Sequence, residues 1–498
     1  MNLRPHQDLA INMLRQSIAT GHKRPILAAP TSFGKTITAA AIIKNAVEKG
    51  KKVVFICDRI TLVEQALESF DDHKIPVGVM QADHWRTDYS KPVQICSIQT
   101  LAARAKAGKR PFEFDLAIVD ECHTVPKYLI ELMERYNAVI FIGLSATPMS
   151  RGLGKYYDDL IVPITPRDLL AQGYLCPADY YAGRKIATEG VRSRTLPTGG
   201  RDYDERDLAE AIEKDELLNG DIIKNWKLHA EGRQTVAFTP SIRHSKQLVE
   251  EFRMAGIGAE HIDGYMDKEH RQLILDAHDR GEFKILSCSR LLNTGWDSPQ
   301  TSCLIDAFPT RSKIIWVQRI GRILRTAPGK ENAIVLSHTN NLALHGFAED
   351  IVPAELDDGE KQYDERSLTT DKDKPEPKVR ECPQCYREFI GLRCSCGYEV
   401  PIKVQLETTE EELQKVAKED NKYYTKDQKA QFLGELQLYA KNKGYKDGWS
   451  SHKYRERFGV WPSKIKPIVA KSISKETSNF LTHLNIKAHY SRNKRMAK

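Results

Sequence analysis

The sequence predicts an α/β fold with two parallel sheets, and three observations support this prediction. Short, mostly apolar runs alternate with amphipathic stretches over residues 1 to about 340. The runs fall into two groups, at residues 26–29, 53–56, 93–96, 116–119 and 139–142, and then at 235–238, 284–287, 303–306 and 333–336. Strands that are apolar on both faces are typical of a parallel sheet covered by helices. Amphipathic stretches such as 37–48 and 62–70 supply those helices.

We expect the 498 residues to form five parts. The two sheets define domains at residues 1–165 and 166–350, and the join between them lies near 163–176. Residues 351–378 are charged, contain Pro375 and Pro377, and lack apolar periodicity, which is typical of a linker. Residues 379–402 hold a cysteine cluster, and residues 403–498 form a basic, helix-rich tail.

Composition excludes some classes of protein. No apolar run approaches about 18 residues, so the sequence predicts no membrane span. The first residues lack the apolar core of a secretory signal, and we therefore expect an intracellular, cytoplasmic protein. The net charge of +8 permits a polyanionic partner without requiring one. Six scattered cysteines fit buried thiols in a reducing compartment: Cys57, Cys96, Cys122, Cys176, Cys288 and Cys303.

A candidate phosphate-binding loop follows the first predicted strand and opens a helix. It consists of Pro30, Thr31, Ser32, Phe33, Gly34, Lys35 and Thr36. Backbone amides at such a helix start face phosphates, Lys35 reaches the β- and γ-phosphates, and Thr36 binds Mg²⁺. Ala29 stands where the general pattern has its first glycine, and a chance Gly-Lys-Thr at a helix start is the alternative interpretation.

Two adjacent carboxylates end the predicted strand at residues 116–119. In a nucleotide site Asp120 would hold Mg²⁺ and Glu121 would polarise the attacking water. The alternative is a solvated acidic loop. The phosphate loop on a neighbouring strand favours the nucleotide site, because ligands of doubly wound sheets bind at the carboxyl ends of the strands.

These motifs, with others in the same order, resemble those of the superfamily 2 helicases over residues 1–340. Leu3 to Gln7 resembles the adenine-reading motif, with Gln7 as the reader, and Asp58 to Gln65 and Ser97 to Thr100 resemble strand-contacting motifs. Ser145 to Thr147 resembles the segment that couples hydrolysis to movement, Asn293 to Pro299 the fifth motif, and Gln318 to Arg325 the sixth. The Arg-Pro-His-Gln start and the Gly-Trp-Asp-x-Pro form resemble the branch of restriction-enzyme motors, excision-repair helicases and phage helicases.

The resemblance implies two RecA-like motor domains with ATP and Mg²⁺ in the cleft between them. Gly295, Asp297 and Gln318 then contribute to the nucleotide site from the second domain. Arg322 and Arg325 are spaced i and i+3 on a helix predicted over residues 312–326, and they resemble arginine fingers for the γ-phosphate. The alternative is an ordinary amphipathic helix with solvated arginines. That alternative does not explain Gly321, which lowers helix propensity but permits close backbone approach.

Four clustered cysteines predict a structural zinc site. Cys382, Cys385, Cys394 and Cys396 supply four thiolates, although the second pair is closer in sequence than is usual. A site with four cysteine ligands has no open position for substrate, so its role is to hold a fold.

The tail combines basic charge with aromatic residues. From Lys441 onward, lysine and arginine greatly outnumber the acidic residues Asp447, Glu456 and Glu476. Such charge binds phosphates, and exposed rings stack on bases. The alternative is that Trp449, Phe458 and Trp461 form a small core, and we expect both to be partly true. Residues 448–462 also resemble, over a short stretch, a tail of some phage-type helicases.

The sequence therefore predicts an ATP-dependent helicase or translocase acting on nucleic acid, with DNA as the favoured substrate and protein partners undefined. A nucleic-acid-activated ATPase that does not unwind, and the motor subunit of a restriction system, are the alternatives. A metabolic kinase fits least, because it needs neither the second motor domain nor its arginine helix.

Overall fold

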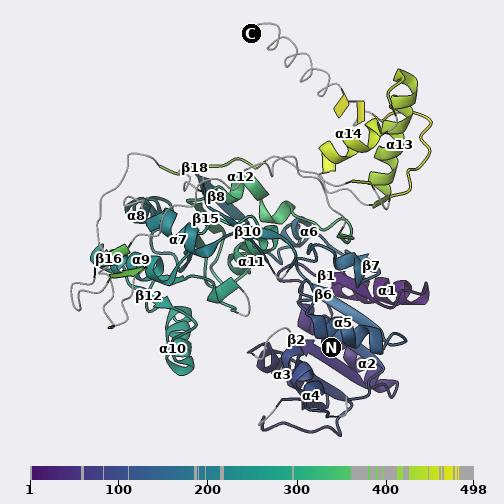
Figure 1. Cartoon of the computed structure of the whole chain (residues 1–498), viewed down its shortest axis with the longest axis horizontal. Coiled ribbons are helices and arrows are strands. Elements are labelled where there is room, and N and C mark those ends of the chain that lie inside the picture. Colours follow the sequence, from purple (N-terminus) through teal and green to yellow (C-terminus); the bar gives the residue numbers. More distant parts are fainter. Residues whose placement is uncertain are drawn as a thin grey trace. The chain divides into compact units, whose positions relative to one another are not determined.

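The computed structural model describes residues 3–57, 61–81, 84–109, 112–183, 188, 190–196, 198–213, 218–293, 296–359, 379–381, 388–390, 396, 412–418, 426–446, 448–458, 461–462, 465–474, 477–478 and 480–481. The chain divides into two compact units, Met1–Lys418 and Glu419–Lys498, and each is described by itself. Figure 1 shows the elements of both units.

The first sheet is parallel throughout and has the strand order β3-β4-β2-β5-β6-β1-β7. Its strands are β1 (Pro25–Ala28), β2 (Val53–Cys57), β3 (Val77–Val79), β4 (Val93–Ser97), β5 (Leu116–Asp120), β6 (Ile140–Ser145) and β7 (Asp159–Ile161). Its helices are α1 (Pro5–Ala19), α2 (Lys35–Glu48), α3 (Thr61–Asp72), α4 (Ile98–Lys106) and α5 (Lys127–Arg135). The five strands predicted here are all present.

Both faces of this sheet are covered, as fully apolar strands require. On β2, Phe55 belongs to the core cluster that includes side chains of α1, α2 and α3. The neighbouring Val54 and Ile56 belong to a second cluster, which includes side chains of α4 and α5. Successive side chains of a strand point to opposite faces, so the two helix groups lie on opposite sides of the sheet.

The second sheet has the order β12-β13-β11-β14-β15-β8-β18, and β18 is its antiparallel strand. The strands are β8 (Ala178–Ala182), β11 (Thr235–Phe238), β12 (Ala259–Ile262), β13 (Ile285–Cys288), β14 (Cys303–Asp306), β15 (Ala333–Ser337) and β18 (Gln414–Lys415). The helices are α6 (Pro166–Ala171), α7 (Glu205–Glu213), α8 (Leu218–His229), α9 (Ile242–Met254), α10 (Lys268–Asp279), α11 (Lys313–Ile323) and α12 (Asn341–His345). The predicted pair of parallel α/β domains is thereby confirmed.

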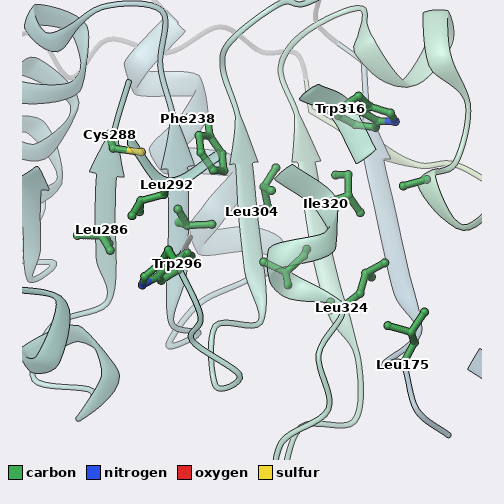
Figure 2. Close-up of a cluster of buried hydrophobic side chains, with 14 of the residues drawn as sticks. Leu175, Phe238, Leu286, Cys288, Leu292, Trp296, Leu304, Trp316, Ile320 and Leu324 are labelled. Atoms are coloured by element: carbon green, nitrogen blue, oxygen red, sulfur yellow. The ribbon is translucent and has the colours of Figure 1, made fainter. Parts of the chain in front are cut away.

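Helix α11 packs on the second sheet through its apolar face. Trp316 and Ile320 are fully buried on this helix, and Leu324 follows them at its end. Figure 2 shows these side chains beside Phe238 of β11 and Leu304 of β14. Burial of this face fixes the helix that carries Arg322, one of the two predicted arginines.

A hairpin that the sequence analysis did not predict joins the two domains. It consists of β9 (Ser193–Thr195) and β10 (Arg201–Tyr203). At its base, the carboxylate of Asp202 accepts hydrogen bonds from the Thr310 hydroxyl and the Arg311 backbone N–H, both at 2.8 Å. At its tip, the Thr198 carbonyl accepts a hydrogen bond from the Arg151 N–H at 3.1 Å. The hairpin thus contacts the first domain at Arg151, which follows the Ser145–Thr147 segment in the sequence.

The predicted linker needs correction at its start, because residues 351–359 pack against the first domain. Leu356 is buried in the core cluster of that domain. The Asp357 carbonyl accepts the Gly154 N–H, and its carboxylate accepts the Gly152 N–H, both at 2.7 Å. We call residues 351–359 the strap. The sequence suggested a linker because the apolar residues of the strap follow no helix or strand period, and one of them, Leu356, anchors it.

The second unit contains α13 (Lys426–Lys443) and α14 (Trp449–Phe458). They pack around a small core that includes Phe432, Leu436 and Tyr454. Gly434 permits this packing, since a Cβ there would lie 1.8 Å from the Ile468 carbonyl oxygen. Within the described residues, none of the helices is both long enough and apolar enough to cross a bilayer. The cytoplasmic location stays a prediction.

Candidate active site

The phosphate loop joins β1 to α2 in a conformation that accounts for its departures from a glycine-rich sequence. Gly34 has φ 88° at the N-cap of α2, and Ser32 has φ 64°. Left-handed backbone is uncommon for a residue with a side chain and often marks a functional site. Phe33 between them is fully buried in the core. The loop is therefore anchored by an aromatic side chain in place of additional glycine.

Gln7 lies directly against this loop. Its side-chain amide donates to the Phe33 carbonyl at 2.9 Å, and its Oε1 accepts the Arg4 backbone N–H at 2.8 Å. A Cβ at Gly34 would lie 2.3 Å from Gln7 Nε2, which explains why glycine stands there. Gln7 thus helps to hold the phosphate loop, and its adenine-reading role stays a prediction.

Lys35 and Glu121 meet at the carboxyl end of the first sheet. Lys35 Nζ donates to Glu121 Oε1 at 2.5 Å, and Glu121 has a left-handed φ of 48°. Burial alone would lower the pKa of Lys35, but the carboxylates of Glu121 and Asp120 outweigh it and raise that pKa. Burial would raise the pKa of Glu121, but Lys35 and His123 lower it overall. Both groups are thus held in their charged forms.

Asp120 has a different environment from its neighbour. Burial is the largest cause of its raised pKa, and the charge of Glu121 adds to it, while Lys35 opposes it. One of its oxygens accepts the Glu121 backbone N–H at 3.0 Å. A half-buried carboxylate of this kind favours a nearby cation, so Asp120 fits a Mg²⁺ ligand.

His123 connects the carboxylate of Glu121 to the second domain. Its Nδ1 lies 3.0 Å from Ser145 Oγ and 3.2 Å from Glu121 Oε2. Its Nε2 lies 3.4 Å from Nε2 of Gln318 on α11. The chain Glu121–His123–Gln318 therefore joins the candidate hydrolytic centre to α11, with Ser145 as a branch.

The two domains approach each other closely where α11 meets the phosphate loop. A Cβ built on Gly321 would lie 2.4 Å from Thr31 Oγ1, closer than real Cβ contacts come. The predicted reason for this glycine, a close backbone approach, is consistent with this geometry. Glycine at this position lets the arginine helix reach the phosphate loop.

Arg322 is half-buried beside the acidic strand end. Its Nη1 donates to the Trp296 carbonyl at 2.6 Å. Burial, together with the nearby charge of Arg325, lowers its pKa to about 10, and Glu121 opposes this shift. Arg322 stays protonated at neutral pH and lies within electrostatic range of Glu121 across the cleft.

Two family models match the chain. The one described as "Type III restriction enzyme, res subunit" matches residues 1–150, and the one described as "Helicase conserved C-terminal domain" matches residues 214–327. Together they match more than half of the chain. The chain belongs to the superfamily 2 helicases. The predicted enzyme class, an ATP-hydrolysing helicase or translocase that depends on nucleic acid, is thereby confirmed.

Individual relatives of this helicase are distant. A 51.5 kDa protein of a Lactococcus phage (isolate 7-9) is 26% identical over 403 residues, which cover 79% of this chain and 82% of that protein. The ATP-dependent DNA helicase uvsW of Enterobacteria phage T4 is 23% identical over 339 residues, or 63% of this chain and 64% of uvsW.

A solved structure shares the fold. The DNA-bound Type ISP restriction-modification enzyme LlaBIII has a TM-score of 0.52 at 18% identity, covering 68% of this helicase and 28% of that enzyme. The helicase thus corresponds to less than a third of that larger protein.

One predicted feature of the sixth helicase motif is wrong. The helix predicted over residues 312–326 is α11, which ends at Ile323, so Arg322 and Arg325 do not share a helix face. Arg325 instead forms an isolated bridge with Leu175 and an ion pair with Asp297. Backbone beyond the helix end places Arg325, and tertiary pairing of this kind cannot be read from residue spacing.

Sequence analysis gave Arg319 of the same motif no role. It is 1% exposed, donates to the Phe308 carbonyl at 2.7 Å, and lies 3.5 Å from the buried carboxylate of Asp306. This network holds α11 on the second sheet. An acidic residue at the end of an apolar strand, Asp306, is a signal that could have suggested a buried partner.

Several predicted residues lie outside the described part of the chain. These are Gly295, residues 58–60 of the first strand-contacting motif, and Cys382, Cys385 and Cys394. Cys396 is described and exposed. Across the described residues, no group of three or more His, Cys, Asp or Glu side chains is placed to hold a metal ion. Zinc is therefore still a prediction from the cysteine spacing.

Proposed function

We propose that this helicase moves along DNA by hydrolysing ATP in the cleft between its two motor domains. One observation carries the proposal: Lys35 bonds Glu121 at 2.5 Å on the first domain, and the half-buried Arg322 of the second domain lies within electrostatic range of the same carboxylate. Groups from two domains that share one ligand make cleft closure depend on that ligand, which is how binding becomes movement.

The assigned roles follow from this arrangement. Lys35 binds the β- and γ-phosphates at the start of α2. Thr31 to Gly34 supply backbone N–H groups, and Pro30, which has none, lines the loop beside them. Thr36 and Asp120 hold Mg²⁺, which neutralises phosphate charge when bound. Glu121 orients and polarises the attacking water.

Residues of the second domain complete the site. Arg322 and Arg325 stabilise the charge that develops on the transferred phosphoryl group. Gln318 couples α11 to the first domain, because its Nε2 lies 3.4 Å from Nε2 of His123. Gly295 and Asp297 contribute from the fifth motif, where Asp297 pairs with Arg325.

The test is ATPase activity measured in parallel with single-stranded DNA, duplex DNA, forked DNA and RNA. Strong stimulation by DNA with weak stimulation by RNA supports the proposal, and the reverse order contradicts the assignment to DNA. Strand separation measured beside the ATPase rate distinguishes a motor that unwinds from an ATPase that only translocates or remodels.

Two proposals concern the region beyond the motor. One structural Zn²⁺ is bound by Cys382, Cys385, Cys394 and Cys396. A small zinc module is supported by the antiparallel strands β16 (Val379–Glu381) and β17 (Glu388–Ile390), which lie on either side of the first two cysteines in the sequence. The tail at residues 403–498 binds nucleic acid, supported by its excess of lysine and arginine. Truncation at residue 402 should weaken DNA binding strongly at low salt and little at high salt.

A further inference from the structure

The aromatic residues of the second unit fall into two sets. Phe432 and Tyr454 are buried in its core, and Phe458 and Phe480 pack against them. The other set, Tyr439, Tyr445 and Trp449, lies where α13 ends and α14 begins. Tyr439 and Trp449 of this set also pack against the core, whereas Tyr445 lies outside it and is exposed. The core therefore holds Trp449 in place beneath a ring, Tyr445, that folding does not bury.

The second set forms an ordered stack at the surface. The rings of Tyr445 and Trp449 are 4.6 Å apart with an interplanar angle of 21°, and Tyr439 lies 5.7 Å from Trp449 on a tilted plane. Tyr445 is 43% exposed. Because Trp449 covers one face of the Tyr445 ring, much of that exposure falls on its opposite face and its edge. We call this pair the Tyr445–Trp449 stack.

The turn that carries the stack is open and basic. Gly444 and Gly448 have φ 67° and 93°, and a Cβ on either would meet no atom within 4 Å. Lys441, Lys443 and Lys446 are exposed on the same turn. Among the ion pairs within the described residues, none involves these three lysines.

We propose that the Tyr445–Trp449 stack receives an unpaired base of a single strand, whose phosphates lie against Lys441, Lys443 and Lys446. The inference rests on the proposed binding of nucleic acid by the tail, and it adds which form of nucleic acid binds and where. A base inside a duplex already has both faces covered by its neighbours, whereas an unpaired base offers a face to a protein ring. Stacking of this kind is tolerant of sequence, because every base has such a face.

The test uses the full chain and a Tyr445→Ala variant. Fluorescence anisotropy measures binding to a labelled oligothymidine and to a blunt duplex of equal length, without nucleotide. The variant should bind oligothymidine about 5-fold to 100-fold more weakly, the range expected for the loss of one stacked base. Its affinity for duplex should change less than 2-fold. Tyr445→Phe should bind as the wild type does, because the ring is kept.

Two further variants separate stacking from charge and from surface change in general. Val469→Ala trims another exposed apolar side chain of the same unit, 91% exposed, and should leave both affinities unchanged. Replacing Lys441, Lys443 and Lys446 together by Gln should weaken both complexes and flatten the slope of log affinity against log salt. Circular dichroism and a melting curve verify that each variant is folded.

The outcomes distinguish this inference from the proposal beneath it. If Tyr445→Ala keeps its oligothymidine affinity while the lysine variant loses it, the stack does not receive a base although the tail binds nucleic acid. If Tyr445→Ala weakens duplex as much as oligothymidine, the single-strand assignment is wrong. If neither variant changes binding, while truncation at residue 402 does, this turn is not the contact site. If truncation also has no effect, the tail does not bind nucleic acid, and a protein partner for this turn replaces the proposal.

Discussion

Replacing Gly321 by Ala should have two opposing effects. It should stabilise α11, and it should disturb the contact between α11 and the phosphate loop. Alanine favours an α-helix over glycine by about 1 kcal/mol, and Gly321 lies within α11. The added Cβ, however, would lie 2.4 Å from Thr31 Oγ1 of the phosphate loop, whereas ordinary contact begins near 3.4 Å. The two domains must therefore separate by about 1 Å at this point, or Thr31 must rotate against the loop.

We expect Gly321→Ala to be folded and slightly more stable, yet a poor ATPase. The free energy of unfolding of the second motor domain should rise by about 0.5–1 kcal/mol, measured by urea denaturation. The kcat for ATP should fall about 10-fold to 100-fold, because a misplacement of about 1 Å costs up to that factor when groups must meet in a transition state. Steady-state ATPase assays at saturating single-stranded DNA measure this loss.

Two controls identify the cause. Gly264→Ala adds the same methyl group in the same domain at a position where no atom lies within 4 Å, and kcat should stay unchanged. Thr31→Ala in the Gly321→Ala background removes the obstructing side chain. The double variant, compared with Gly321→Ala alone and Thr31→Ala alone in a double-mutant cycle, should regain most of the lost kcat. Wild-type kcat in Gly321→Ala, or no coupling between the two positions, would refute the argument.

Four further predictions follow from the same structure. Glu121→Gln should bind a fluorescent ATP analogue normally but lose turnover at least about 100-fold, and near-normal turnover would remove Glu121 from hydrolysis. Arg322→Ala should lower kcat about 1000-fold while the Kd for ATP changes little, and an equal loss in both would indicate simple binding or misfolding. Metal analysis should find about one Zn²⁺ per chain, absent after Cys382→Ser with Cys385→Ser. Burial lowers the pKa of His244 from 6.5 to about 4, so the unfolded chain takes up its proton first as pH falls. The free energy of unfolding is therefore unaffected by protonation of His244 above pH 6.5, and it decreases by about 3 kcal/mol as the pH falls towards 4. His244→Gln should therefore flatten stability measured by urea denaturation from pH 7.5 to 5, and equal slopes would contradict it.

Much of the fold and of the first-domain site follows from local sequence. The strands could be predicted because a central parallel strand is buried on both faces, and burial leaves a continuous apolar run such as Val53 to Cys57. The phosphate loop could be predicted because its residues act as neighbours in sequence. Lys35 and Glu121 meet because both follow strands of one parallel sheet, whose carboxyl ends share an edge.

The features that escaped prediction depend on contacts between distant residues. Leu356 stands at the start of a charged stretch, and its burial against the first domain leaves no periodic signal. Arg319 has the charge of a surface residue, and only the network with Asp306 makes its burial possible. Arg325 is placed by its bridge to Leu175 beyond the end of α11. In each case tertiary structure overrides what residue type and spacing indicate.

We propose that the bond between Lys35 and Glu121 links phosphate binding by Lys35 to the activation of water by Glu121. A carboxylate that accepts from an ammonium group at 2.5 Å is held in its charged form and its pKa is lowered, so it is a weak base towards water. A triphosphate that binds Lys35 competes for the same ammonium protons and releases Glu121. The pKa of Glu121 then rises, and His123, 3.2 Å away, remains to orient the carboxylate. Glu121 thus becomes an effective base only when Lys35 has a phosphate to bind, which ties water activation to the presence of substrate. Lys35→Met tests this argument, because it should abolish turnover while raising the pKa of Glu121, measured by carbon-detected NMR of labelled glutamate. An unchanged pKa in that variant would show that Lys35 does not control the carboxylate.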